Sequence, residues 1–234
     1  MKPDQLPLAM RWPAQQRFDT FLRGENALAV ELLRQASRSA QAPWVFVAGP
    51  AGAGKTHLLL AACAAADEAG RSAQYLPLQR VRSGGADALR SLGGSDLLAL
   101  DDIDAAAGDA DAEHALFDLY NRCRVENHTL LFGAAAAPAQ AGFGLPDLVS
   151  RLSACAQAVL KPLADDGRRE ALRRRAYVRG LILDEAVLDF LFSRTQRDLA
   201  SLSALLDRID REALAAQRRI TVPFLRELLK ETPR

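Results

Sequence analysis

Short apolar runs alternate with helical patterns along the first two thirds of the chain. The apolar runs predict five strands, at residues 44–48, 73–78, 97–100, 129–134 and 157–160. Helical patterns lie between them, notably at 57–69 and at 112–127, where one face carries Leu116, Leu119, Tyr120 and Cys123. Because strands that alternate with helices form parallel sheets covered on both sides, we expect an α/β fold with a five-stranded parallel sheet.

After Pro162 the pattern becomes helical only. Four helices are expected, at 166–178, 184–194, 198–217 and 221–230, and Asp184 and Thr221 are suitable N-caps for two of them. The chain therefore divides into an extended N-terminal tail at 1–16, an α/β domain at 17–163 and a small all-helical domain at 164–234.

Composition excludes several classes of protein. The 234 residues are 49% hydrophobic and carry a net charge of +1, so the whole chain is not a basic surface for DNA or anionic membranes. The three cysteines are isolated, which argues against a zinc site or a disulfide framework. No apolar run approaches the roughly 18–20 residues of a membrane span, and no signal peptide is recognisable. We expect a cytoplasmic protein without a membrane partner.

A phosphate-binding pattern follows the first predicted strand. The stretch GPAGAGKT at 49–56 matches G-x-x-x-x-G-K-[ST], and it lies between a strand and a helix as this pattern requires. Backbone amides of such a loop surround phosphate oxygens, the lysine neutralises the β- and γ-phosphates, and the threonine hydroxyl holds Mg²⁺. We expect ATP or ADP with Mg²⁺ to bind at Gly49, Pro50, Gly52, Ala53, Gly54, Lys55, Thr56 and His57.

The third predicted strand ends in two aspartates. Asp101 is the candidate for the Mg²⁺ site together with Thr56, and Asp102 is the candidate acid that orients an attacking water. More acidic residues follow, but their spacing does not match a calcium-binding EF-hand loop. We expect a solvated loop or the start of a helix for Asp104, Asp109, Asp111 and Glu113.

Four stretches resemble the AAA+ domain of the bacterial replication initiator DnaA. They are RFDTFLRGEN at 17–26, the phosphate-binding loop, LALDDI at 98–103 and GLPDLVSRL at 144–152. The last of these, together with AAQRRITVPFLRELL at 215–229, resembles the Hda-type proteins, which are short relatives of DnaA. This resemblance implies an AAA+ domain followed by a helical lid domain. It also implies negative regulation of replication initiation, in which the protein and the DNA-loaded sliding clamp promote hydrolysis of ATP bound to DnaA.

The resemblance also suggests residue roles and exposes departures from the family pattern. Arg151 matches the arginine finger, which acts on the nucleotide of another subunit. The stretch LLFGAAAAPA at 130–139 offers no polar sensor 1 side chain after Phe132. The sensor 2 position falls on Ala200, with Arg197 one turn earlier as the alternative. We therefore expect weak ATPase activity in the isolated protein.

The N-terminal tail contains QLPLAM at residues 5–10. Prolines at 3, 7 and 13 disfavour a strand of the sheet and favour an extended peptide that binds in a groove. The stretch resembles the clamp-binding motif of Hda-type proteins, which implies contacts with the β subunit of the sliding clamp by Gln5, Leu6, Leu8 and Met10.

Two other functions stay open at this point: an AAA+ helicase loader of the DnaC kind, and a replication adaptor that does not depend on nucleotide. Six arginines between Arg168 and Arg179 form either a solvated face or a surface for weak DNA or partner contact. Because AAA+ sites lie between subunits, we also expect a homo-oligomer, with a dimer among the candidates.

Overall fold

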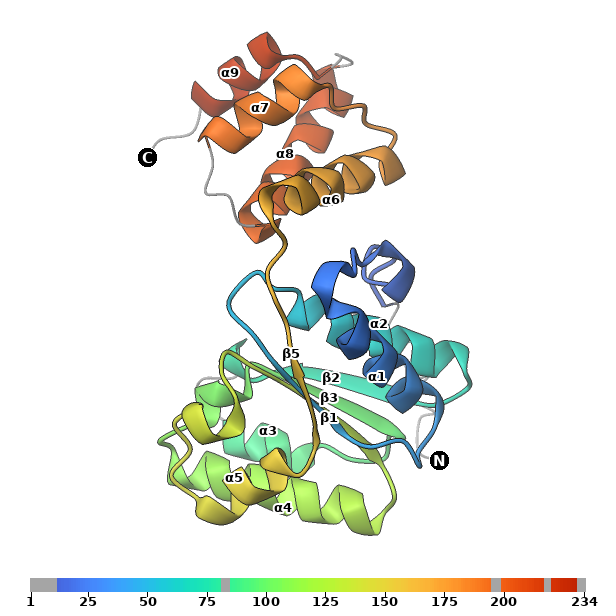
Figure 1. Cartoon of the computed structure of the whole chain (residues 1–234), viewed down its shortest axis with the longest axis vertical. Coiled ribbons are helices and arrows are strands. Elements are labelled where there is room, and N and C mark those ends of the chain that lie inside the picture. Colours follow the sequence, from blue (N-terminus) through green and yellow to red (C-terminus); the bar gives the residue numbers. More distant parts are fainter. Residues whose placement is uncertain (1–11, 81–84, 195–198, 217–219, 231–234) are drawn as a thin grey trace, which may run out of the picture. The chain divides into compact units, whose positions relative to one another are not determined.

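The computed structural model describes residues 12–80, 85–194, 199–216 and 220–230 (Figure 1). These residues form two compact units. The first unit contains residues 12–21, 25–50 and 54–160, and the second contains 22–24, 51–53 and the described residues from Lys161 onward. The predicted contacts of Gln5, Leu6, Leu8 and Met10 lie outside the described residues.

Five parallel strands form the sheet of the first unit (Figure 1). All five predicted strands are confirmed to within one residue at each end: β1 (Val45–Ala48), β2 (Ala73–Pro77), β3 (Leu97–Asp101), β4 (Thr129–Ala134) and β5 (Ala156–Val159). Their order across the sheet is β2-β3-β4-β1-β5. Although β2 comes between β1 and β3 in the sequence, the strand that lies between them in the sheet is β4.

The register brings the carboxyl ends of the three central strands to one edge. Ala48 of β1 pairs with Ala134 of β4, and Leu100 of β3 pairs with Phe132 of β4. These three strands are entirely buried. The loops that follow them therefore start side by side, at the edge where parallel α/β sheets bind ligands.

Helices cover both faces of this sheet (Figure 1). One face carries α1 (Ala27–Arg38) and α2 (Lys55–Glu68), and the other carries α3 (Gly85–Ser91), α4 (Ala110–Val125) and α5 (Pro146–Ser153). Short 3₁₀ turns join these elements, at η1 (Phe18–Thr20), η2 (Gly24–Asn26), η3 (Leu78–Arg80), η4 (Ile103–Ala106) and η5 (Pro138–Gln140). The α2 and α4 predictions are confirmed, whereas α1 and α3 were not anticipated from the sequence.

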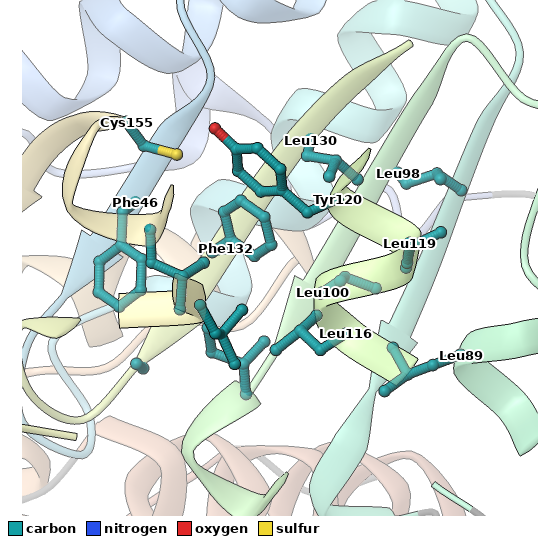
Figure 2. Packing of buried hydrophobic residues seen from close by; sticks show 14 of the residues in the cluster. Phe46, Leu89, Leu98, Leu100, Leu116, Leu119, Tyr120, Leu130, Phe132 and Cys155 are labelled. Atoms are coloured by element: carbon teal, nitrogen blue, oxygen red, sulfur yellow. The ribbon is translucent and has the colours of Figure 1, made fainter. Parts of the chain in front are cut away.

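The main core lies between the sheet and helices α3, α4 and α5 (Figure 2). Its centre is aromatic: the Tyr120 ring stacks on Phe132 with centroids 6.4 Å apart and meets Trp44 edge-on at 4.7 Å. The predicted apolar face of α4 is confirmed, because all four of its residues are buried, namely Leu116, Leu119, Tyr120 and Cys123.

The second unit is helical, as predicted. Its helices are α6 (Asp165–Val178), α7 (Glu185–Arg194), α8 (Leu199–Ala216) and α9 (Val222–Lys230). Both N-caps are confirmed: the Asp184 carboxylate accepts a hydrogen bond from the Val187 amide at 2.8 Å, and the Thr221 hydroxyl accepts one from the Phe224 amide at 3.4 Å. None of the described helices combines the length and the apolar character of a membrane-spanning segment.

Candidate nucleotide-binding site

The phosphate-binding loop joins β1 to α2 and needs glycine at two positions. Gly52 has φ of 77° and Gly54, the N-cap of α2, has φ of 102°, which is the left-handed region that favours glycine. A Cβ on Gly54 would also lie only 2.7 Å from a ring carbon of Phe21. The loop is tied to the sheet edge, because the Gly49 amide donates to the Ala134 carbonyl at 3.2 Å.

Lys55 supplies a buried cation inside this loop. Its residue is 8% exposed, and its ammonium donates to the carbonyl oxygens of Gly49 at 2.7 Å and Pro50 at 3.3 Å. Among the residues that the structure describes, no carboxylate forms an ion pair with Lys55. Since carbonyl oxygens do not neutralise a charge, the loop presents a cation that stabilises an anion such as phosphate.

Thr56 and Asp101 come together although 45 residues separate them. The Thr56 hydroxyl donates to Asp101 Oδ2 at 2.6 Å, and Asp101 is fully buried at the end of β3. Tyr75 of β2 donates to the same oxygen at 2.9 Å, and the Asp102 amide donates to Oδ1 at 3.0 Å. Burial and the neighbouring Asp101 charge raise the pKa of Tyr75, so its phenol stays protonated and donates. A hydroxyl beside a carboxylate is the hard-oxygen chemistry that Mg²⁺ prefers.

Gly133 of β4 packs directly against Asp101. A Cβ at this position of β4 would lie 2.5 Å from Asp101 Oδ1 and 2.9 Å from Leu59 Cδ1. The strand therefore cannot carry a side chain there while Asp101 keeps its place. Two residues later, the Ala135 amide donates to the Asp104 carboxylate at 3.3 Å.

We expect Gly133→Ala to lower the free energy of unfolding by about 1–3 kcal/mol, because the new methyl group overpacks the contact with Asp101. Urea denaturation measures this change. Gly93→Ala is the matched control, since a Cβ at Gly93 meets nothing within 4 Å. Equal stability of the two variants would contradict the steric explanation.

Asp102 occupies a strained backbone position next to this site. Its φ of 51° is left-handed, which is uncommon for a residue with a side chain, and it caps the short η4 turn. Burial first, and the charges of Asp101 and Asp104 next, raise the pKa of Asp102, while Lys55 opposes the shift. The Asp102 carboxylate is therefore half-buried, with acidic side chains and the Lys55 cation as its charged neighbours.

The segment just after the N-terminal tail packs against the start of α2. His57 Nε2 lies 2.9 Å from the Arg17 carbonyl oxygen and 3.5 Å from the Thr20 hydroxyl, and the Phe21 ring lies 5.3 Å from the His57 ring. Phe21 therefore borders the phosphate-binding loop, a placement that motif reading missed. The only sequence signal was the position of Phe21 within the DnaA-like stretch 17–26.

A cavity of about 440 Å³ adjoins Asp102 but does not suit phosphate. Five aspartates are among its lining residues: Asp87, Asp102, Asp104, Asp109 and Asp111. Within the described part of the chain, no group of three or more His, Cys, Asp or Glu side chains is arranged to hold a metal ion.

The acidic stretch behaves only partly as the sequence suggested. Asp109 begins α4, because its carboxylate accepts hydrogen bonds from the amides of Asp111 and Ala112. Asp111 is exposed and pairs with Arg90. Glu113 lies in the first turn of α4, as the helix-start alternative expected, but its side chain is buried, with 2% exposed.

Arg151 lies on α5, which covers the face of the sheet opposite to α2 (Figure 1). The residue is exposed, and its guanidinium carbon lies 6.0 Å from the centroid of the Tyr120 ring. No carboxylate of the described ranges pairs with it. The helix therefore presents an uncompensated guanidinium on the side of the sheet away from the chain's own α2.

Five of the six arginines between residues 168 and 179 pair with described carboxylates of the same unit. Arg168 pairs with Asp165, Arg169 with Asp189 at 2.7 Å, and the remaining pairs join Arg173 to Glu185 and Glu170, Arg174 to Glu170 and Arg179 to Asp207. Burial lowers the pKa of Arg175. This arrangement favours an ion-paired, solvated face over a phosphate-binding surface.

Models of two protein families match this chain, one in each part. Residues 13–158 match the model of the bacterial DnaA ATPase domain. The chain belongs to the bacterial DnaA ATPase family. Residues 165–229 match the model of the Hda lid domain. Both parts of the resemblance inferred from the sequence, DnaA in the first unit and Hda in the second, are confirmed.

Solved structures show the same AAA+ fold. Domain III of the replication initiation protein DnaA from Thermotoga maritima matches with a TM-score of 0.78 at 20% identity, over 94% of this chain and 98% of that chain. AMPPCP-bound DnaA from Aquifex aeolicus matches with a TM-score of 0.68 at 22% identity, over 85% and 66%. The Holliday junction branch migration motor RuvB from Thermotoga maritima matches with a TM-score of 0.66 at 17% identity, over 94% and 72%.

Proposed function

We propose that this DnaA-family protein is an Hda-type negative regulator of replication initiation. It binds the sliding clamp through its N-terminal tail and promotes hydrolysis of ATP bound to DnaA through Arg151. The observation that carries the proposal is the exposed Arg151 guanidinium, which has no carboxylate partner among the described residues and lies on the face of the sheet opposite to α2. That placement supports action on the nucleotide of another molecule.

Arg151 would act by stabilising negative charge electrostatically. As water attacks the γ-phosphate, negative charge spreads over its equatorial oxygens and the leaving oxygen. A planar guanidinium donates several hydrogen bonds to such oxygens and keeps its charge at every physiological pH. No proton transfer through Arg151 is required, so position and charge decide the rate.

We also propose that the chain binds ADP or ATP with Mg²⁺ at its own loop. Lys55 would hold the phosphates, and Thr56 and Asp101 would hold the metal, whose charge neutralises phosphate oxygens when it is bound. The arrangement supports retention of the nucleotide more than its hydrolysis. Gly133 leaves β4 without a side chain beside Asp101, so this position supplies no side-chain hydrogen bond to a γ-phosphate.

Clamp binding by the tail is proposed from the sequence alone and would bring the protein to the nucleoid. We expect the Gln5→Ala, Leu6→Ala double variant to weaken clamp binding about 100-fold or more, because it removes the proposed apolar contact of Leu6 and the proposed polar contacts of Gln5 with the clamp. Surface plasmon resonance with immobilised clamp measures this loss. Nucleotide affinity should stay unchanged, and clamp binding equal to wild type would contradict the assignment.

The experiment that tests the proposed function is hydrolysis of labelled ATP bound to DnaA of the same bacterium. It is measured with and without this protein, in the presence of clamp loaded on DNA. Strong stimulation that requires all components is expected. Absence of stimulation would overturn the proposal, and binding to the replicative helicase in its place would support a DnaC-like loader.

A further inference from the structure

Glu113 is a buried carboxylate that the proposed mechanism does not use. It lies in the first turn of α4 and is 2% exposed. Oε1 accepts hydrogen bonds from the amides of Gly108 at 2.8 Å and Gly144 at 3.0 Å, and Oε2 accepts one from the Leu145 amide at 2.7 Å. Burial opposes ionisation, but these three amides together hold the pKa of Glu113 below its usual value. The side chain therefore stays ionised and accepts all three bonds at neutral pH.

Two of the three amides lie immediately before α5. Leu145 is the N-cap of α5, and Pro146 is its first residue. No side chain of the cap position bonds to the first turn of α5. The Glu113 carboxylate, which comes from a neighbouring helix 31 residues earlier, thus holds the backbone from which α5 starts.

Helices α4 and α5 also meet near Tyr120. Tyr120 follows Glu113 by seven residues, or about two turns, so both lie on one face of α4. Its ring is fixed between Trp44 and Phe132, and the Arg151 guanidinium carbon lies 6.0 Å from the ring centroid. α4 therefore contacts α5 at its start through Glu113 and beside Arg151 through Tyr120.

We propose that Glu113 is a positioning residue, which sets the orientation of Arg151 through the backbone at 144–145 and the short helix α5. This inference rests on the proposed function of Arg151. Arg151 is six residues after Leu145, which corresponds to about 9 Å along a helix. A change of angle at the start of α5 therefore displaces the guanidinium. Electrostatic catalysis is sensitive to such displacements, and 1 Å can cost about 100-fold in rate.

The test uses Glu113→Gln in the full-length protein. Glutamine keeps the size of the side chain, but its NH₂ group cannot accept a hydrogen bond, so at least one of the three amides loses its partner. Asp118→Asn is the matched control, because Asp118 is an exposed carboxylate on the same helix. The first measurement is amide hydrogen exchange, which reports the order of α5 without reference to catalysis. Exchange in residues 144–153 should accelerate at least tenfold in Glu113→Gln, while exchange in α2 stays unchanged.

The second measurement is the stimulated hydrolysis of DnaA-bound ATP. In Glu113→Gln, the maximal rate should fall 10- to 100-fold, whereas the protein concentration that gives half-maximal stimulation should change less than threefold. Clamp and nucleotide affinities should stay within twofold of wild type. In an Arg151→Ala background, Glu113→Gln should reduce the rate by less than twofold further, because the group that it positions is already absent.

Several results would overturn the inference. They are unchanged exchange in α5, an unchanged maximal rate, a loss that adds fully to that of Arg151→Ala, or a parallel loss of clamp and nucleotide binding that indicates general destabilisation. If Arg151→Ala itself leaves stimulation intact, the proposed function fails and this inference falls with it. If Arg151→Ala loses stimulation but Glu113→Gln keeps the maximal rate, the proposed function stands and Glu113 has a structural role alone.

Discussion

Replacing Arg151 with alanine is expected to reduce the stimulated hydrolysis of DnaA-bound ATP by about 1,000-fold or more. An arginine that reaches a γ-phosphate from another subunit contributes about 10³–10⁵ to the rate of phosphoryl transfer. Arg151 is exposed on α5 and has no carboxylate partner among the described residues, so its charge is free to meet phosphate oxygens.

The same change should leave the fold intact. The contact of Arg151 with the Tyr120 ring is at 6.0 Å, and an exposed cation–π contact contributes about 0.5–1 kcal/mol. Clamp binding, nucleotide affinity and the free energy of unfolding should therefore stay near wild type. A loss of stimulation with unchanged binding identifies a group that acts on the reaction and not on assembly.

Two further variants sharpen this result. Arg151→Lys keeps the positive charge but loses the planar fork of donors, so we expect only partial recovery of the rate. Arg38→Ala removes an exposed arginine from α1, on the other face of the sheet, and should have no effect. Single-turnover measurement with labelled ATP on DnaA gives all three rates. If Arg151→Ala stimulates as well as wild type does, the arginine-finger proposal is wrong.

Local patterns were sufficient to predict most of the fold. The five strands are short apolar runs between turn residues, and α4 shows its buried face through Leu116, Leu119 and Tyr120. α1 carries a comparable helical pattern in its buried residues Ala29, Val30, Leu33 and Ala36, so its position was also predictable from the sequence. In contrast, α3 has seven residues and buries only Leu89 among them, so packing against α4 decides its existence and local propensity does not.

The candidate site was predictable where one loop or strand end carries a motif. Thr56 and Asp101 could be expected to meet because the ends of parallel strands share one edge of the sheet. Tyr75 and Gly133 could not, since their roles depend on β2 and β4 lying on either side of β3. The helical phase of Leu116 and Tyr120 places Glu113 on the buried face. Its amide partners, however, lie in another loop that no local pattern links to it.

Lys55→Ala is expected to weaken nucleotide binding about 100-fold or more. Each hydrogen bond from a charged donor contributes about 1.5–3 kcal/mol, and the ammonium is placed to make two of them, as its bonds to the carbonyls of Gly49 and Pro50 show. Titration calorimetry with ADP and with ATP measures the loss. Arg38→Ala is again the control, because it removes an exposed cation far from the loop in sequence.

The effect of Lys55→Ala on the hydrolysis of DnaA-bound ATP distinguishes the proposed regulator from a nucleotide-independent adaptor. In the proposed function, the regulator acts in its nucleotide-bound form, so Lys55→Ala should also lose most of its stimulation of DnaA-bound ATP hydrolysis. An adaptor would keep full stimulation although it no longer binds nucleotide. Because the change also removes the donor to the Gly49 and Pro50 carbonyl oxygens, the free energy of unfolding of Lys55→Ala is measured alongside. Full stimulation by a variant that has verifiably lost ADP and ATP would therefore reject the nucleotide-dependent function while leaving the role of Arg151 open to its own test.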